Sequence, residues 1–98
     1  MQIVISGRHT NLRDGEKKLI SEKLAKYERK VQGLTKVDAI VNVEGDRHGI
    51  ELILHVAHSN PLVAKAEATS NAGACDVAIS KLDNLVSKLM GKRNDHHR

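Results

Sequence analysis

The chain of 98 residues has 40% hydrophobic residues and a formal net charge of +4, from 16 Lys and Arg against 12 Asp and Glu. This length supports one hydrophobic core rather than two, and the moderately basic balance suits either an anionic partner or an ordinary solvated surface. The single aromatic residue, Tyr27, argues against recognition that stacks nucleic-acid bases on aromatic platforms, and the single cysteine, Cys75, excludes an internal disulfide framework.

The sequence also predicts the compartment. The first residues lack the basic start and apolar run of a secretory signal peptide, and no apolar stretch approaches the roughly 18 residues of a membrane span. We therefore expect a cytoplasmic protein with no membrane partner.

The first third of the chain predicts a strand followed by a helix. Residues 2–6 contain a β-branched run that predicts a strand. Residues 14–32 predict an amphipathic helix, capped at its start by Asn11 or Asp14 and at its end by Gly33. The core face expected of this helix follows helical spacing and comprises Ile20, Leu24, Tyr27 and Val31, with Leu19 alongside.

Three further strands are predicted next. Residues 36–44 and 50–58 alternate apolar and polar side chains, which is typical of half-buried strands, and a turn at 45–49 joins them into an antiparallel hairpin. Residues 62–69 alternate in the same way, with small alanines on the inward face that let a helix pack closely. The outward face is expected to expose Asn42, Glu44, Glu51, His55, Lys65 and Glu67.

The last element is predicted to be a helix that begins at Ser70 or Asn71 and ends near Gly91. Its apolar stripe comprises Ala78, Leu82, Leu85, Val86 and Leu89. Residues 1–93 are expected to form one domain and residues 94–98 a flexible tail. The order β-α-β-β-β-α predicts an α+β fold of two layers, in which two helices cover one face of a four-stranded sheet.

Residue types that carry catalysis or bind metals form no recognisable pattern. His55 and His58 are three residues apart in a predicted strand, so their side chains point to opposite faces and cannot share one ion. No zinc-site spacing occurs, and the alanine-rich surroundings of Cys75 predict a small buried residue rather than a nucleophile. We expect no metal, no cofactor and no enzymatic activity.

Basic residues lie off the apolar stripes of both predicted helices. If the helices lie side by side, the two clusters can approach each other and contact phosphates with salt-sensitive affinity. The alternative, a charged surface that is merely solvated, stays open. The candidate RNA-binding residues are Lys26, Arg29 and Lys30 of the first helix, and Lys81, Lys88, Lys92 and Arg93 of the last.

Several segments together resemble one known family. They are Met-Gln-Ile-Val-Ile-Ser-Gly at 1–7, Glu-Lys-Leu-Ala-Lys-Tyr-Glu at 22–28, Val-Asn-Val-Glu at 41–44, Leu-His-Val at 54–56, and Ala78-Ile79 followed by Leu82, Val86 and Met90. In order and spacing they are similar to the short bacterial ribosome hibernation promoting factors, also described as ribosome-associated inhibitor A or sigma-54 modulation proteins.

This resemblance implies a fold similar to double-stranded-RNA-binding domains. It also implies binding to 16S rRNA between the head and body of the small (30S) ribosomal subunit, where such factors overlap the mRNA and tRNA positions and block translation under stress or in stationary phase. Some short forms promote pairing of 70S ribosomes into 100S dimers with a ribosome modulation factor. Lys26, Lys88 and Lys92 fall on positions that match basic residues of the family, and Arg93 lies just beyond.

Two other functions stay open at this point. One is a general double-stranded-RNA-binding module that acts away from the ribosome. The other is a protein-interaction regulator of transcription that uses the open face of the sheet.

Overall fold

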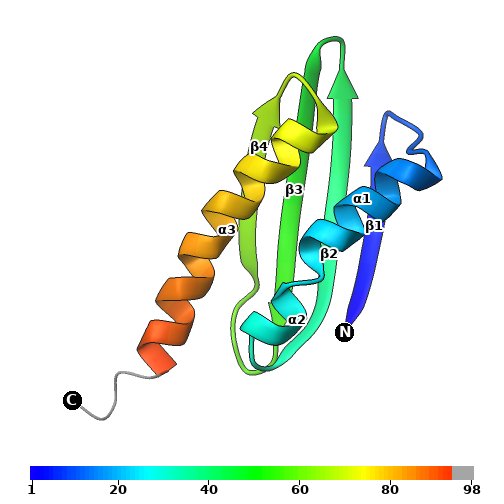
Figure 1. Ribbon diagram of the computed structural model, residues 1–98. Helices are drawn as coiled ribbons and strands as arrows, with labels where there is room; N and C mark the ends of the chain where they lie inside the picture. The colour runs from blue at the N-terminus through cyan, green and yellow to red at the C-terminus, as the bar shows by residue number, and fades with distance from the viewer. Residues whose placement is uncertain (94–98) are drawn as a thin grey trace.

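A computed structural model describes residues 1–93 and shows a single sheet covered on one face by helices (Figure 1). The predicted tail, residues 94–98, lies outside the described residues. The strands are β1 (Gln2–Arg8), β2 (Leu34–Glu44), β3 (Arg47–Val56) and β4 (Leu62–Ala68), and the helices are α1 (Asp14–Leu24), α2 (Tyr27–Lys30) and α3 (Asn71–Arg93). The predicted two-layer α+β fold is therefore confirmed.

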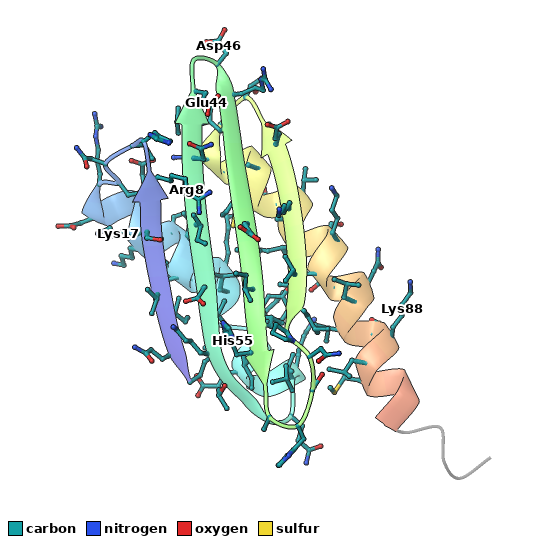
Figure 2. The ribbon with its side chains drawn as sticks, turned by 180° about the vertical axis from the view of Figure 1, so that it is seen from behind. Arg8, Lys17, Glu44, Asp46, His55 and Lys88 are labelled. Carbon is teal, nitrogen blue, oxygen red and sulfur yellow. The ribbon has the colours of Figure 1, made fainter. Side chains whose placement is uncertain are left out.

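The four strands lie side by side in chain order, β1-β2-β3-β4. β1 pairs with β2 in parallel, because the crossover through α1 and α2 returns the chain to the same end of the sheet. β2, β3 and β4 then pair antiparallel through short connections. The helices occupy one face, and the other face is left open (Figures 1 and 2).

The predicted turn at 45–49 is too long. The β2–β3 turn contains only Gly45 and Asp46, and Glu44 lies directly opposite Arg47. Gly45 has a φ of +60°, which suits the first central position of a two-residue hairpin turn. Because this tight turn lets the two strands pair immediately after it, residues 47–49 belong to β3. At its other end, β3 stops at Val56, two residues before the predicted end.

The predicted first helix is interrupted. Instead of one helix over 14–32, α1 ends at Leu24 and the four-residue α2 begins at Tyr27. Between them the backbone N–H of Glu28 donates to the carbonyl of Ala25, and that of Arg29 donates to the carbonyl of Lys26. These bonds between residues three apart tighten the helix locally. As predicted, Gly33 ends this helical segment with a positive φ, +87°.

The starts of α1 and α3 are capped in different ways. Neither predicted residue, Asn11 nor Asp14, caps α1. Its N-cap is Arg13, whose backbone N–H donates to the Glu16 carboxylate at 3.2 Å, which is one half of a capping box. Ser70 caps α3 as predicted, since its hydroxyl accepts a hydrogen bond from the backbone N–H of Gly73 at 3.0 Å.

The core lies between the sheet and the helical layer. The predicted face of the first helical segment is buried, and so are Ala78, Leu82 and Val86 of the predicted α3 stripe, whereas Leu85 and Leu89 are partly buried. Cys75 is fully buried, as expected, and burial raises the pKa of its thiol. Leu19 was predicted to join this core but is 45% exposed, because it lies one position off the buried stripe of α1.

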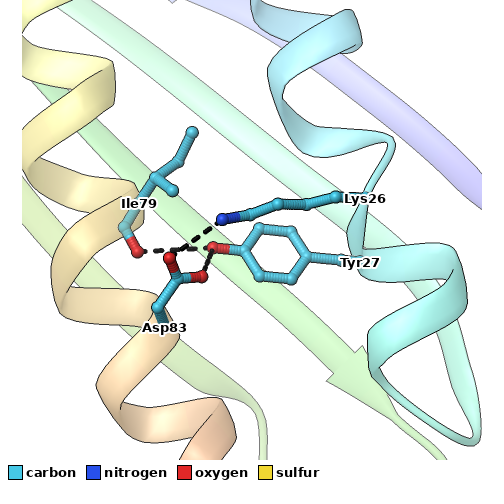
Figure 3. Close-up of polar contacts among 4 residues, drawn as sticks. All are labelled: Lys26, Tyr27, Ile79 and Asp83. Carbon is cyan, nitrogen blue, oxygen red and sulfur yellow. Dashed lines mark hydrogen bonds and ion pairs between the residues drawn. The ribbon is translucent and has the colours of Figure 1, made fainter.

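One carboxylate joins the two parts of the helical layer (Figure 3). Asp83 of α3 accepts a hydrogen bond from the Tyr27 hydroxyl at 2.7 Å and from the Lys26 ammonium at 2.9 Å. Burial and the hydrogen bond to Asp83 both raise the pKa of Tyr27. Although burial opposes the shift, hydrogen bonds from Lys26 and Tyr27 hold the pKa of Asp83 below its ordinary value.

We predict that the packing of α3 depends on Leu82. Leu82→Ala should lower the free energy of unfolding by about 2–5 kcal/mol, because this fully buried side chain leaves a cavity between helix and sheet. The same substitution at the exposed Leu19 should change it by less than about 0.5 kcal/mol. Urea denaturation of both variants measures this, and equal losses would contradict the burial described above.

We also predict that Asp83 stabilises the fold in a pH-dependent way. Because its pKa is lowered in the folded chain, its contribution is present above the ordinary aspartate pKa of about 4 and is lost as the pH falls through the lowered value. Asp83→Asn keeps an acceptor for Tyr27 but loses the charge. It should be less stable than the parent at pH 7, and the difference should shrink by pH 3.

Urea titrations at pH 7, 5 and 3 measure this dependence. Asp46→Asn is the matched control, because Asp46 lies exposed in the β2–β3 turn and forms no ion pair within residues 1–93. A stability difference for Asp83→Asn that stays constant across these pH values would show that the charge of Asp83 does not contribute.

Candidate nucleic-acid interface

The predicted basic residues of α3 lie on a different side of that helix from its acids. Asp76 and Asp83 are seven residues apart, two helical turns, and both reach toward the α1–α2 segment. Lys81 and Lys88 are also seven apart but lie on another side of α3. The two predicted basic clusters therefore do not meet directly across the helical layer, because acids of α3 stand between them.

Two lysines of the first helical segment are already paired with those acids. Lys26 contacts Asp83 at 2.9 Å and lies 5.2 Å from the centre of the Tyr27 ring. Lys23 contacts Asp76 at 2.7 Å, and this hydrogen bond is the main cause of a raised pKa for Lys23. A phosphate that approaches either lysine must compete with a carboxylate.

Lys81 contacts the sheet rather than extending from the helical face. Its ammonium donates to the backbone carbonyl of Lys65 in β4 at 2.8 Å. β4 is an edge strand, and a lysine bound to a carbonyl of such a strand obstructs pairing with another chain. The structure therefore separates Lys81 from the other predicted RNA-binding residues.

Three of the predicted residues remain available. Arg29 and Lys30 of α2 and Lys88 of α3 are exposed and take part in no ion pair or hydrogen bond within residues 1–93. Lys88 projects outward from α3, away from the sheet (Figure 2). Lys92 and Arg93 belong to the last turn of α3, and their side chains lie outside what the structure describes.

Sequence reasoning missed the acids that pair with the lysines of this face. Asp76 and Asp83 were not singled out, although their seven-residue spacing on α3 was available, as was the three-residue spacing of Lys23 and Lys26. These spacings show that the residues share a helix face but not which neighbour they meet. The role of the Tyr27 hydroxyl, which also lies 3.4 Å from the carbonyl of Ile79, depends on the helix interruption that the sequence did not predict.

The open sheet face has a balanced charge. Lys36 lies 3.4 Å from Asp38, and the His55 ring nitrogen lies 2.8 Å from the same carboxylate (Figure 2). These hydrogen bonds hold the pKa of Asp38 below its ordinary value even though burial raises it. Longer contacts join Arg47 to Glu67 at 3.9 Å and Lys65 to Glu51 at 4.0 Å. A face with interspersed acids is a poor surface for a polyanion.

A polar chain links the starts of α1 and α3 to β3. Asn71 donates to Glu16 at 2.6 Å and lies 2.7 Å from the ring of His48. Hydrogen bonds from the Arg13 backbone and from Asn71 lower the pKa of Glu16. This chain lies at the first residue of α3, whereas Lys88 lies in the last third of that helix, so the chain supports the fold rather than the basic face.

Within residues 1–93 no three side chains of His, Cys, Asp or Glu gather as metal ligands would. No helix in this part of the chain has both the length and the apolar composition needed to cross a membrane. The described surface does present exposed lysine and arginine side chains, which can bind anions.

Comparison with solved structures supports the fold. A ribosomal subunit interface protein from Coxiella burnetii superposes with a TM-score of 0.82 at 18% identity, covering 93% of this chain and 99% of its own. The N-terminal domain of Protein Y from Thermus thermophilus superposes with a TM-score of 0.81 at 20% identity, covering 91% and 99%. At these identities the likeness concerns the arrangement of strands and helices.

Sequence comparison shows the family. The ribosome hibernation promoting factor of Azotobacter vinelandii is 34% identical over 88 residues, which are 90% of this chain and 81% of that protein. The factor of the same name from Pseudomonas putida is 32% identical over 90% of this chain and 85% of its own. The family profile described as sigma 54 modulation protein / S30EA ribosomal protein matches residues 3–94, so the chain belongs to that family.

Proposed function

We propose that the protein is a non-catalytic ribosome hibernation factor that acts in the cytoplasm and binds the small (30S) ribosomal subunit. Residues 1–93 act as a single ribosome-binding domain. Family membership supports this proposal, as do the names of relatives that cover nine-tenths of the chain. The observation that carries it is that Arg29, Lys30 and Lys88 are exposed without an ion pair within residues 1–93, while most charged side chains of the open sheet face are paired.

The mechanism is electrostatic docking on the 16S rRNA backbone. Arg29 and Lys30 of α2 and Lys88 of α3 contact phosphates first, because they form no ion pair within residues 1–93, and Lys92 and Arg93 follow Lys88 in the sequence. Recognition of the backbone suits a chain with one aromatic residue, which offers no platform for stacking bases. The body of the domain then occupies the mRNA and tRNA channel, which stops translation under stress or in stationary phase.

Lys26 and Lys23 provide a second step. Their ion pairs with Asp83 and Asp76 are partly exposed, and such pairs are weak enough for a phosphate to displace. Docked on the channel, the factor holds 70S ribosomes inactive, and with a ribosome modulation factor it promotes their pairing into 100S dimers.

We predict that reversing the free cations abolishes binding. The triple variant Arg29→Glu, Lys30→Glu, Lys88→Glu should fail to co-sediment with 30S subunits at about 0.1 M salt, because each lost phosphate contact removes counterion release. The matched control Lys36→Glu, Arg47→Glu, Lys65→Glu makes the same change in net charge on the open sheet face and should still bind.

Increasing salt should weaken binding by the parent chain steeply, and an excess of an rRNA-free RNA duplex should not displace it from 30S subunits. Binding that is insensitive to salt, or lost equally in both triple variants, would contradict docking by the helical layer. Displacement by an equal amount of duplex would instead identify a general double-stranded-RNA-binding module.

We further predict that Asp76→Asn strengthens binding to 30S subunits. The change releases Lys23 for a phosphate contact, and an exposed ion pair of this kind is weak, so affinity should rise by only a few-fold. Asp46→Asn, which removes the same charge from the β2–β3 turn, is the control for net charge. Filter binding at fixed salt measures both, and an equal gain in the two variants would contradict a specific role for Asp76.

A further inference from the structure

A groove of about 450 Å³ lies on the open face of the sheet and is lined by residues of all four strands and by Lys81 of α3. Figure 2 is the view onto this face. One row of paired residues runs across all four strands through this groove: Arg8 lies opposite Asn42, Asn42 opposite Gly49, and Gly49 opposite Glu67. We name these four residues the groove row. Lys65 of β4 and Lys81 of α3 also line the groove.

Gly49 is not required by the fold. It lies within β3 without a positive φ, and a Cβ added there would approach no atom closer than 3.8 Å. Glycine inside a strand weakens the strand, and where neither backbone nor packing demands it, it often marks the close approach of a ligand or of another backbone. The missing side chain keeps the floor of the groove hollow.

Asn42, next to Gly49, carries an unused acceptor. Its Oδ1 atom is buried and has no hydrogen-bond partner among the described residues. Buried polar atoms almost always have a partner in the protein or in water, so this acceptor at the groove is available to a donor from water or from a bound ligand. This atom and Gly49 are independent observations that indicate the same place.

The charges of the groove describe the partner. Arg8 forms no ion pair within residues 1–93, while Glu67 and Glu51 have only long contacts, of 3.9 Å to Arg47 and 4.0 Å to Lys65. The lining mixes Arg8, Lys65 and Lys81 with Glu51 and Glu67, so the groove lacks the uniform positive charge that suits a polyphosphate. A polypeptide can supply an acidic side chain, an N–H donor and a basic side chain in sequence, which complements the row from Arg8 to Glu67.

We propose that the groove binds an extended polypeptide segment of a partner protein, which lies across the four strands. Its acidic side chain meets Arg8, an amide N–H donates to Asn42 over the space at Gly49, and a basic side chain meets Glu67. Strands are about 4.8 Å apart, so the row spans about 14 Å, and an extended chain advances about 3.4 Å per residue. An acid and a base four residues apart, facing the same side, therefore match the row.

The test uses the full chain labelled with nitrogen-15 and a blocked peptide, acetyl-Ser-Glu-Thr-Gln-Thr-Lys-Ser-amide. Titration followed by NMR should shift the backbone amides of the groove row and leave those of Arg29 and Lys88 unchanged. A second peptide with glutamine in place of both charged residues should bind at least tenfold more weakly. Because the helical cations are not involved, the result is independent of whether the proposed ribosomal function holds.

Two variants separate binding from folding. Gly49→Val fills the groove and Asn42→Val removes the orphaned acceptor, and both should keep or raise the melting temperature, because a β-branched residue suits a strand. Each should weaken the peptide at least tenfold and leave 30S binding unchanged. Gln2→Val places the same β-branched side chain at the far end of the same face and should leave peptide binding unaltered.

Three results would overturn the proposal. One is the absence of shifts in the groove row at millimolar peptide, and another is unchanged peptide binding in Gly49→Val. The third is a single-stranded oligoribonucleotide that shifts the same four amides and displaces the peptide, which would assign the groove to RNA.

Discussion

The Asp83 carboxylate is the contact on which the arrangement of the helical layer depends. α3 packs mainly on β3 and β4, and α1 lies over β1, so the two helical segments share little direct contact. Asp83 bridges them by accepting from Tyr27 and from Lys26 at once, and the Lys23–Asp76 pair adds a second bridge. A charge-assisted hydrogen bond to a buried tyrosine is stronger than a neutral one, and it is more directional than apolar contact. This bridge therefore sets how the two helical segments lie with respect to each other.

The same bridge divides the lysines of the helical layer into two classes. Lys23 and Lys26 form ion pairs with carboxylates, whereas Arg29, Lys30 and Lys88 form none within residues 1–93. In the proposed function, the cations without an ion pair would attract the anionic partner, and Lys23 and Lys26 would respond only to a phosphate close by. Asp76 and Asp83 would then lower the binding affinity while their ion pairs join the helical segments.

The two faces of the molecule differ in how their charged side chains are arranged. The helical side concentrates unpaired positive charge, which acts over a Debye length and guides association. On the open sheet side, positive and negative side chains alternate across neighbouring strands, so their electrostatic field largely cancels at a distance. Only a partner that contacts this face closely would interact with the individual charges. The hollow at Gly49 and the unused oxygen of Asn42 lie on this second face. One small domain thus presents one surface for long-range attraction and one for short-range fit.

Much of the fold could be predicted because it depends on local periodicity. Alternation in β2 to β4 and the stripe of Ile20, Leu24, Tyr27 and Val31 identified the core faces correctly. Errors occurred where a local signal was ambiguous. Gly45 and Gly49 both indicated a turn, but only Gly45 has a positive φ. Arg13 occupies the N-cap position of α1, although Asn11 and Asp14 are residue types that cap helices more often. The interruption at Ala25 and Lys26 has no signature residue such as proline or glycine.

The sequence by itself determined the order of elements, the single core, the absence of an internal disulfide and the resemblance to a family, since these depend on composition and on spacing along the chain. Only the tertiary structure decided which charges are free. The sequence does not distinguish Lys26 and Lys81 from Lys30 and Lys88. In the structure, Lys26 pairs with Asp83, and Lys81 donates to a backbone carbonyl of β4. Pairing between residues more than 50 positions apart, as between Lys26 and Asp83, depends on how helices pack, and helical periodicity does not encode it.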